Sequence, residues 1–101
     1  MKKRYDDANN KIYYTGNNGY TGVGDLDERG NEIHYKDSYG YESWTEYDQN
    51  NNRIKFKDNY GFGYVSEFYE NNKLKRTTHY NGIICSFDHN GNITIDMPNM
   101  K

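Results

Sequence analysis

The sequence repeats itself with a period of 21 residues. The segment LDERGNEIHYKDSYGYESWTE (26–46) is followed directly by YDQNNNRIKFKDNYGFGYVSE (47–67), and the turn glycines keep the same spacing at Gly19, Gly40, Gly61 and Gly82. A period of about 20 to 50 residues is typical of repeat proteins, whose units bury apolar surface only against their neighbours. We therefore expect one repeat domain over residues 1–101, with a basic lead at 1–4 and a tail at 97–101.

Each unit contains two short segments in which apolar and polar residues alternate, and turns rich in Gly and Asn separate them. Alternation with period two indicates strands, and turns every eight to twelve residues are typical of consecutive hairpins. The pattern predicts an all-β fold: an antiparallel β-meander of about four 21-residue hairpin repeats that forms a twisted, curled sheet. The expected strands are 11–15, 20–25, 32–36, 41–47, 53–57, 62–69, 73–79, 83–87 and 93–96.

The fourth unit is less regular than the others. Leu74 stands one position before the place where the period predicts an apolar residue, so we expect the strand 73–79 to be displaced by about one residue. The aromatic-Asp pair that opens each unit returns as Phe87-Asp88, two positions early. The fourth unit is therefore interpreted as a degenerate copy of the other three.

One face of the predicted sheet, called here the aromatic face, is expected to form the core. Only 33% of the chain is hydrophobic while 17% is aromatic, so Tyr and Phe rings must supply much of the buried area. Aromatic stripes of this kind usually pack on one another rather than on a ligand. Strict alternation assigns to this face Ile12, Tyr14, Tyr20, Leu26, Ile33, Tyr35, Tyr41, Tyr47, Ile54, Phe56, Phe62, Tyr64, Phe68, Leu74, Ile83, Cys85 and Phe87.

The opposite face, called here the Trp44 face, carries a smaller apolar series within charged surroundings. The series is Val23, Trp44, Val65 and Ile84, and its charged neighbours are His34, Glu42, Glu46 and Glu67. Two interpretations remain open. The series is either a thin cross-strand ladder that covers the sheet or an anchor for a partner, because Trp surrounded by charge is a common composition of a binding hot spot. The second interpretation makes Trp44, Glu42, Glu46 and His34 candidate binding residues.

The turns carry a row of tyrosines, Tyr39, Tyr60 and Tyr80, along one side of the predicted sheet. The simpler interpretation is that each ring folds back over its own hairpin. The alternative is a binding rim, since Tyr offers a large contact area at a small entropic cost. Tyr39 and Tyr60 are therefore retained as further candidate binding residues.

No catalytic or metal-binding signature is present. His34, His79 and His89 form no ligand spacing with one another or with Cys85, and the Asp-rich turns do not match an EF-hand loop. We expect no enzymatic activity, no catalytic residues, no metal and no cofactor. The net charge of −2, the single cysteine and the lack of a long apolar stretch favour a cytoplasmic protein without a membrane span and without direct nucleic-acid binding.

The phrases YDDANNKI, LDERGNEI, YDQNNNRI and FDHNGNITI resemble the YD-repeat of Rhs-type proteins, whose unit also has a Tyr-Asp pair, a Gly/Asn turn and an apolar position. The resemblance implies a β-hairpin repeat. Large Rhs proteins wrap such repeats into a shell around a toxin, a role that four units cannot fill. Short proteins with these repeats look like products of phages or mobile elements, many of which, such as anti-CRISPR proteins, inhibit a host defence complex.

The first functional hypothesis is a non-enzymatic protein-binding module that docks on a larger protein or nucleoprotein complex and blocks it. The second is a structural or self-assembling repeat protein that pairs through its edge strands. A carbohydrate-binding module is a third. For the free protein we expect a monomer or a homodimer that pairs by an edge or by the aromatic face.

Overall fold

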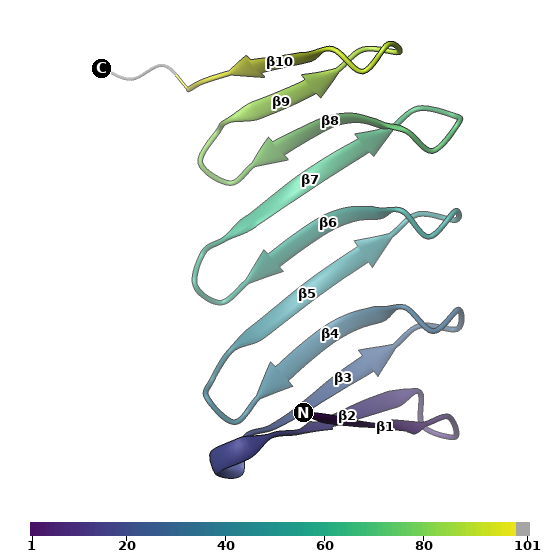
Figure 1. Cartoon of the computed structure of the whole chain (residues 1–101), viewed down its shortest axis with the longest axis vertical. Helices are drawn as coiled ribbons and strands as arrows, with labels where there is room; N and C mark the ends of the chain where they lie inside the picture. Colours follow the sequence, from purple (N-terminus) through teal and green to yellow (C-terminus); the bar gives the residue numbers. More distant parts are fainter. Residues whose placement is uncertain (99–101) are drawn as a thin grey trace.

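The computed structural model describes residues 1–98 and shows a single sheet of ten antiparallel strands (Figure 1). The strands follow one another in chain order, and their turns alternate between the two sides of the sheet. The predicted all-β meander of 21-residue hairpin repeats is confirmed. The strands are β1 (Lys2–Asp6), β2 (Lys11–Thr15), β3 (Thr21–Leu26), β4 (Glu32–Asp37), β5 (Glu42–Tyr47), β6 (Arg53–Asp58), β7 (Gly63–Phe68), β8 (Leu74–His79), β9 (Ile84–Phe87) and β10 (Ile93–Asp96).

The two ends of the chain differ in their relation to the sheet. β1 already begins at Lys2, so the residues expected to form a basic lead belong to the first strand and pair with β2. At the other end Met97 and Pro98 follow β10 without strand structure, and the rest of the expected tail lies outside the described residues. A single 3₁₀ turn, η1 (Asn17–Gly19), joins β2 to β3.

Most hairpins are closed by five-residue turns of one design. In the turn that starts at Asp58, the backbone N–H of Gly61 donates to the carbonyl oxygen of Asp58, and Gly61 has a φ of +88°. Only Gly and Asn adopt such left-handed conformations routinely, which explains why the same place holds Asn51 and Asn72 in other turns, with φ of 65° and 67°. The predicted positive φ of Gly40 and Gly61 is confirmed.

The carboxylate that opens a turn holds its backbone together. Oδ1 of Asp48 accepts hydrogen bonds from the backbone N–H groups of Asn50 and Asn52, at 2.8 and 2.9 Å. Where the first residue is not Asp, as in the turn from Tyr69 to Lys73, Oδ1 of Asn71 accepts from the N–H of Lys73 instead. The Asp and Asn residues of these turns are therefore explained by turn chemistry.

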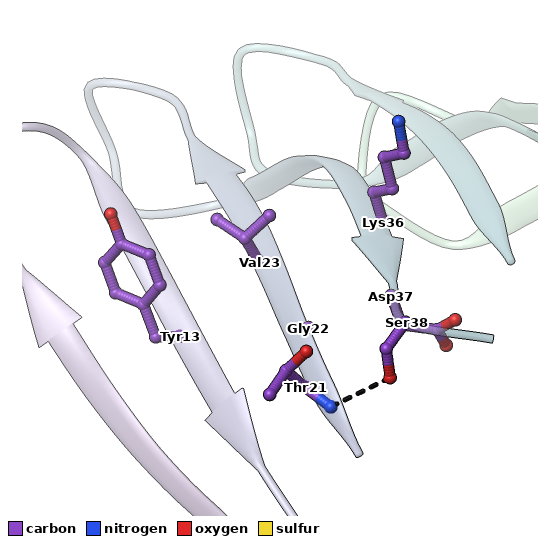
Figure 2. A pocket seen from close by; sticks show the side chains of 7 residues that line it. All are labelled: Tyr13, Thr21, Gly22, Val23, Lys36, Asp37 and Ser38. Carbon is purple, nitrogen blue, oxygen red and sulfur yellow. Dashed lines mark hydrogen bonds between the residues drawn. The ribbon is translucent and has the colours of Figure 1, made fainter. Parts of the chain in front are cut away.

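Neighbouring repeats are also tied together at the turns. The N–H of Ser38, in the turn after β4, donates to the carbonyl oxygen of Thr21 at 2.8 Å, and its Oγ accepts from the N–H of Thr21 at 3.0 Å (Figure 2). Asn59 makes the corresponding backbone bond to Glu42 one repeat later. Each such turn thereby extends the hydrogen bonding of the sheet beyond its strands.

A β-bulge recurs at the start of β4, β6 and β8. Its extra residue is Ile33 in β4, Ile54 in β6 and Lys75 in β8, and these three positions are 21 residues apart. The predicted one-residue displacement of the fourth unit is therefore wrong. Leu74 occupies the place of Glu32 and has Phe68 as its cross-strand partner, so the repeat stays in register and merely carries Lys where earlier units carry Ile.

The bulge also changes which residues share a face. The hydroxyl of Tyr14 donates to Oε2 of Glu32 at 2.5 Å, and the ring of Tyr14 lies 5.5 Å from that of Tyr35. Glu32 and Tyr35 thus lie on one face although strict alternation separates them. Ile33 is displaced to the Trp44 face, where it lines a hollow beside Trp44. Its assignment to the aromatic face is wrong, and Ile54, as the extra residue of its own bulge, does not follow the alternation either.

The aromatic face is not a buried core within this chain. Among the described residues, Ile12 is the only apolar side chain that is buried, at 3% exposure, because no second layer covers the sheet. Packing is instead lateral: Ser43 and Ser66 are buried at 7% each, while large rings from neighbouring strands contact one another, as Phe56 does with Tyr64 at a centroid distance of 5.7 Å. Small residues therefore let the rings close over the backbone.

Candidate docking surface

Three strands bring the residues around Trp44 together. Trp44 on β5 lies directly across from His34 on β4 and from Lys57 on β6. Its ring lies 5.7 Å from the His34 ring, and Nζ of Lys57 lies 5.3 Å from its centroid. The Trp44 patch, as the term is used below, comprises Ile33, His34, Glu42, Trp44, Glu46 and Lys57.

Trp44 is fixed in place although it is 36% exposed. A cation over an indole ring is attracted by the ring quadrupole, so Lys57 restrains the side chain from one flank. His34 contacts it from the other flank. A large side chain that is held in position and open to solvent loses little further conformational freedom when it is covered.

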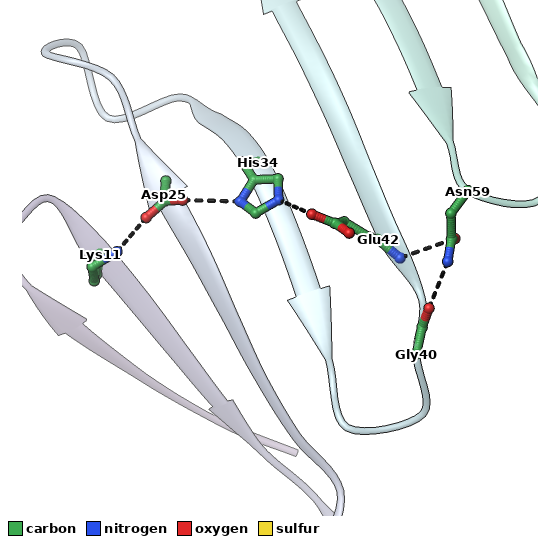
Figure 3. A network of polar contacts seen from close by, with 6 residues as sticks. All are labelled: Lys11, Asp25, His34, Gly40, Glu42 and Asn59. Atoms are coloured by element: carbon green, nitrogen blue, oxygen red, sulfur yellow. Dashed lines mark hydrogen bonds and ion pairs between the residues drawn. The ribbon is translucent and has the colours of Figure 1, made fainter.

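A chain of polar contacts crosses four strands next to Trp44 (Figure 3). Nε2 of His34 lies 2.6 Å from Oε2 of Glu42 on β5, and Nδ1 lies 2.9 Å from Oδ2 of Asp25 on β3. Asp25 is bound in turn by Nζ of Lys11 on β2, at 2.5 Å. Both imidazole nitrogens therefore face carboxylates, and only the protonated ring can donate to both.

Within this series of polar contacts, each charged group favours the ionised form of its neighbour. The hydrogen bond to Glu42, followed by that to Asp25, raises the pKa of His34 above its ordinary value. The hydrogen bond from Lys11, followed by that from His34, lowers the pKa of Asp25. The same carboxylate raises the pKa of Lys11. The contacts thus favour a positively charged imidazole between two negatively charged carboxylates.

The main chain at Glu42 is anchored by the following repeat. Oδ1 of Asn59 accepts a hydrogen bond from the N–H of Glu42 at 3.1 Å, and its Nδ2 donates to the carbonyl oxygen of Gly40 at 2.6 Å (Figure 3). Asn59 therefore holds the start of β5, from which Glu42 reaches His34. The patch is built on strands and on a braced turn rather than on a free loop.

Two open hollows lie on the Trp44 face. The first, of about 510 Å³, is lined by Ile33, Trp44, Glu46 and Lys57 among others. The second, of about 340 Å³, is where Tyr13, Val23 and Lys36 rise from β2, β3 and β4 (Figure 2). His34 lies on β4, which contributes residues to both hollows, and Glu42 lies on β5, which lines the first. The surface around Trp44 is therefore hollowed and not flat.

The structure brings together His34, Glu42, Trp44 and Glu46 among the predicted binding residues. It places Glu67, the remaining charged neighbour predicted for this face, on another strand. Glu42, Trp44 and Glu46 alternate on β5 and His34 is the cross-strand neighbour of Trp44. Glu67 lies on β7, where it pairs with Arg76 at 3.6 Å. Asp25, Lys57 and Ile33 were not assigned to this surface from the sequence. All three depend on the bulges, because pairing around each turn without the extra residues Ile33 and Ile54 would set Asp25 opposite Ile33 and Trp44 opposite Phe56.

The proposed ladder of Val23, Trp44, Val65 and Ile84 is not straight. Val23 pairs with Lys36 and Lys36 pairs with Glu42, so Glu42 rather than Trp44 stands in line with Val23. Equivalent residues of successive repeats are therefore staggered along the strands. The interpretation of the series as a continuous cross-strand ladder is wrong, because the stagger places polar and charged residues between its members.

The turn tyrosines pack on the preceding repeat and not on their own hairpin. The Tyr39 ring lies 5.5 Å from Tyr20, and the Tyr60 ring stacks on Tyr41 at 5.8 Å. Both remain well exposed, at 66% and 72%. The expectation that each ring folds over its own hairpin is thus wrong, and neither tyrosine belongs to the Trp44 patch.

Comparison with known proteins identifies no family. Neither the family models nor the curated proteins include a match to this chain. Within residues 1–98 no cluster of three or more His, Cys, Asp or Glu side chains has the arrangement of a metal site. In the same residues no helix has the length and apolarity that a membrane crossing requires.

Proposed function

We propose that this protein is a non-enzymatic binding module that docks on a larger protein through the Trp44 patch. The observation that carries the proposal is Trp44 itself: an exposed indole held between His34 and Lys57 on a braced sheet face. Binding hot spots are enriched in Trp that is surrounded by polar groups which exclude water once the interface has formed. The restraint on the ring lowers the entropic cost of covering it.

The charges of the patch define the chemistry of the partner. Glu46 is the most exposed carboxylate of the patch, at 64% side-chain exposure, and its contact with Lys55 is long, at 3.7 Å. His34 and Glu42 are satisfied by each other. The patch thus fits a partner with an apolar pocket for Trp44 and a basic group at its rim for Glu46.

On this proposal the module acts as an inhibitor, covering a working surface of a larger protein or nucleoprotein complex, as anti-CRISPR proteins of phages and mobile elements do. The resemblance of the turn motifs to YD-repeats supports this part of the proposal. A mixed patch with both signs of charge favours a protein surface over a nucleic-acid backbone as the direct contact.

Replacement of Trp44 by Ala tests the docking. The matched control is Val65→Ala, because Val65 holds the equivalent place one repeat later and is 49% exposed on the same face. A partner captured from the native host by the unaltered protein should bind the Trp44→Ala variant more weakly by about 2 kcal/mol or more, roughly 30-fold in Kd. Val65→Ala should bind normally. Equal affinity of all three proteins, with circular dichroism showing intact folds, would rule out the Trp44 patch as the contact.

A structural role as a self-assembling sheet is the second candidate. Among the described residues β10 pairs only with β9, and its Ile93 and Ile95 are 60% and 58% exposed. An apolar strand with an unpaired side is a template for strand addition. Light scattering from the purified protein tests this role, which predicts particles that grow with concentration and that shrink when Ile95 is replaced by Lys.

A further inference from the structure

His34 is held at both ring nitrogens by carboxylates from the two neighbouring strands. Nε2 lies 2.6 Å from Oε2 of Glu42 on β5, and Nδ1 lies 2.9 Å from Oδ2 of Asp25 on β3 (Figure 3). A neutral imidazole has one N–H and one lone pair, so it can donate to only one of these oxygens. At the other nitrogen two acceptors would face each other at hydrogen-bond distance, which is repulsive. One of the two contacts must therefore break when His34 loses its proton.

The surroundings of the two carboxylates indicate which contact breaks. Asp25 has a second partner, because its Oδ1 binds Nζ of Lys11, and its side chain is 38% exposed to water. Among residues 1–98, His34 is the only side chain that the Glu42 carboxylate contacts by a hydrogen bond or an ion pair, and Glu42 is less exposed, at 28%. Loss of a sole partner costs more than loss of one partner of two. The neutral ring should thus keep its proton on Nε2, facing Glu42, and release Asp25.

The other charged side chains around the imidazole do not hydrogen-bond to it within the described part of the chain. They are Lys36 on the same strand, Glu46 on β5 and Lys57 on β6. Lys57 lies instead on the other flank of Trp44, with Nζ 5.3 Å from the centroid of the indole ring. The orientation of the His34 ring therefore depends on its two carboxylate partners.

The imidazole and the indole of Trp44 pack on one another, with ring centroids 5.7 Å apart and ring planes inclined by 38°. An imidazole that is fixed at both nitrogens restrains this flank of the indole. An imidazole that is fixed at one nitrogen can turn about its side-chain bonds, and the indole then keeps only the restraint from Lys57. The freedom of Trp44 thus depends on the proton of His34.

We propose that His34 is a proton-dependent switch for the position of Trp44. With its proton, the imidazole bridges Asp25 and Glu42 and packs against the indole. Without it, the ring keeps Glu42, releases Asp25 and no longer restrains the indole. Because Glu42 and then Asp25 raise the pKa of His34, the bridged state is present below about pH 6.5 and is lost as the pH rises through the folded value. The switch operates in the free protein, so it does not depend on the docking function.

NMR of the unaltered protein between about pH 5.5 and about pH 9 tests the switch directly. Nuclear Overhauser contacts between the His34 and Trp44 rings should be strong at the acidic end of this range. They should weaken with the same midpoint as the titration of the His34 ring, and the neutral ring should carry its proton on Nε2. Ring contacts that persist unchanged after His34 has lost its proton, or a neutral ring with its proton on Nδ1, overturn the proposal.

Trp44 is the only tryptophan of the chain, so its fluorescence follows the same transition without a label. An imidazolium in contact with an indole quenches the emission of the indole. The emission should therefore rise as the pH rises through the pKa of His34. His34→Gln removes the titrating group and should make the emission independent of pH over this range. An emission change that persists in the His34→Gln variant would belong to another group and would overturn the assignment to His34.

Asp25→Asn distinguishes the switch from a simple change of charge beside Trp44. An amide of the same size can donate to the unprotonated Nδ1, so the bridged arrangement can then form with a neutral ring. The contacts between His34 and Trp44 should persist at high pH in this variant, and His34 should titrate at a lower pH than in the unaltered protein. The matched control Glu46→Gln removes a carboxylate that contacts Lys55, and it should switch as the unaltered protein does. Loss of the ring contacts in Asp25→Asn at the same pH as in the unaltered protein overturns the proposal.

Discussion

The imidazole of His34 lies across the strand pair from the indole of Trp44, with ring centroids 5.7 Å apart, although ten positions separate the residues in sequence. The β4–β5 hairpin produces this contact, and Glu42 and Asp25 orient the imidazole through its two nitrogens. Trp44 is therefore positioned by charged groups on both neighbouring strands, together with Lys57 on β6. Trp44 and the polar contacts of His34 with Glu42 and Asp25 therefore form one structural unit.

The first prediction concerns the left-handed turn position. Gly61→Val should destabilise the protein by about 1 to 2 kcal/mol, because the backbone conformation at positive φ is strained for a residue that has a Cβ atom. A Cβ at Gly61 would meet no atom within 4 Å, so the cost is conformational and not steric. Gly61→Asn should cost less, since Asn51 adopts the same conformation in its own turn. Urea unfolding of the three proteins measures the difference, and a Val variant as stable as the parent would contradict it.

The second prediction concerns the protonation of His34. Its pKa is raised in the folded chain, mainly by Glu42 and then by Asp25. A group whose folded pKa lies above the unfolded value of about 6.5 stabilises the fold below that pH, and this contribution is lost as the pH rises through the folded pKa. Stability should therefore decline as the pH rises from about 6.5 through the folded pKa of His34, by an amount that Glu42→Gln reduces.

NMR titration of the His34 ring provides the direct measurement. Glu42→Gln removes a negative charge from the imidazole and should lower the pKa of His34 toward the ordinary value. Glu46→Gln is the control, because Glu46 stands on the same strand but contacts Lys55 instead. An equal pKa of His34 in all three proteins would mean that the His34–Glu42 contact does not form in solution.

The third prediction concerns the turn aspartates at low pH. Hydrogen bonds from the backbone, foremost that from Asn52, lower the pKa of Asp48 in the folded chain. A carboxyl with a depressed folded pKa stabilises the fold above the unfolded pKa of about 3.9, and this contribution is lost as the pH falls through the folded value. Asp48→Asn should therefore be less stable than the parent at neutral pH, and the gap should close on acidification.

Thermal unfolding between about pH 2 and pH 7 measures this gap across the unfolded pKa. Asp7→Asn serves as the control, because Asp7 is an exposed acidic residue outside the strands. A stability difference for Asp48→Asn that does not change with pH would show that the turn depends on the shape of the side chain and not on its charge.

The sequence by itself determined the repeat architecture. The alternation around Tyr35 and the turn glycines Gly40 and Gly61 act over a few residues and recur with a period of 21. These local patterns were sufficient to predict nine of the ten strands, the turns between them and their antiparallel order, whereas β1 was taken for a basic lead. The same alternation placed Glu42, Trp44 and Glu46 on one face of one strand.

Only the tertiary structure decided the register between strands and the number of layers. The bulges that move Ile33 to the Trp44 face and keep Leu74 in register depend on pairing across strands, which a single-strand pattern does not encode. The contact of His34 with Asp25 has the same origin. Alternation also cannot distinguish a face that is covered by a second layer from one whose rings pack sideways, because both require apolar residues at every second position. The sequence pattern of the aromatic face therefore predicts a core, although Ile12 is the only apolar side chain that is buried among the described residues.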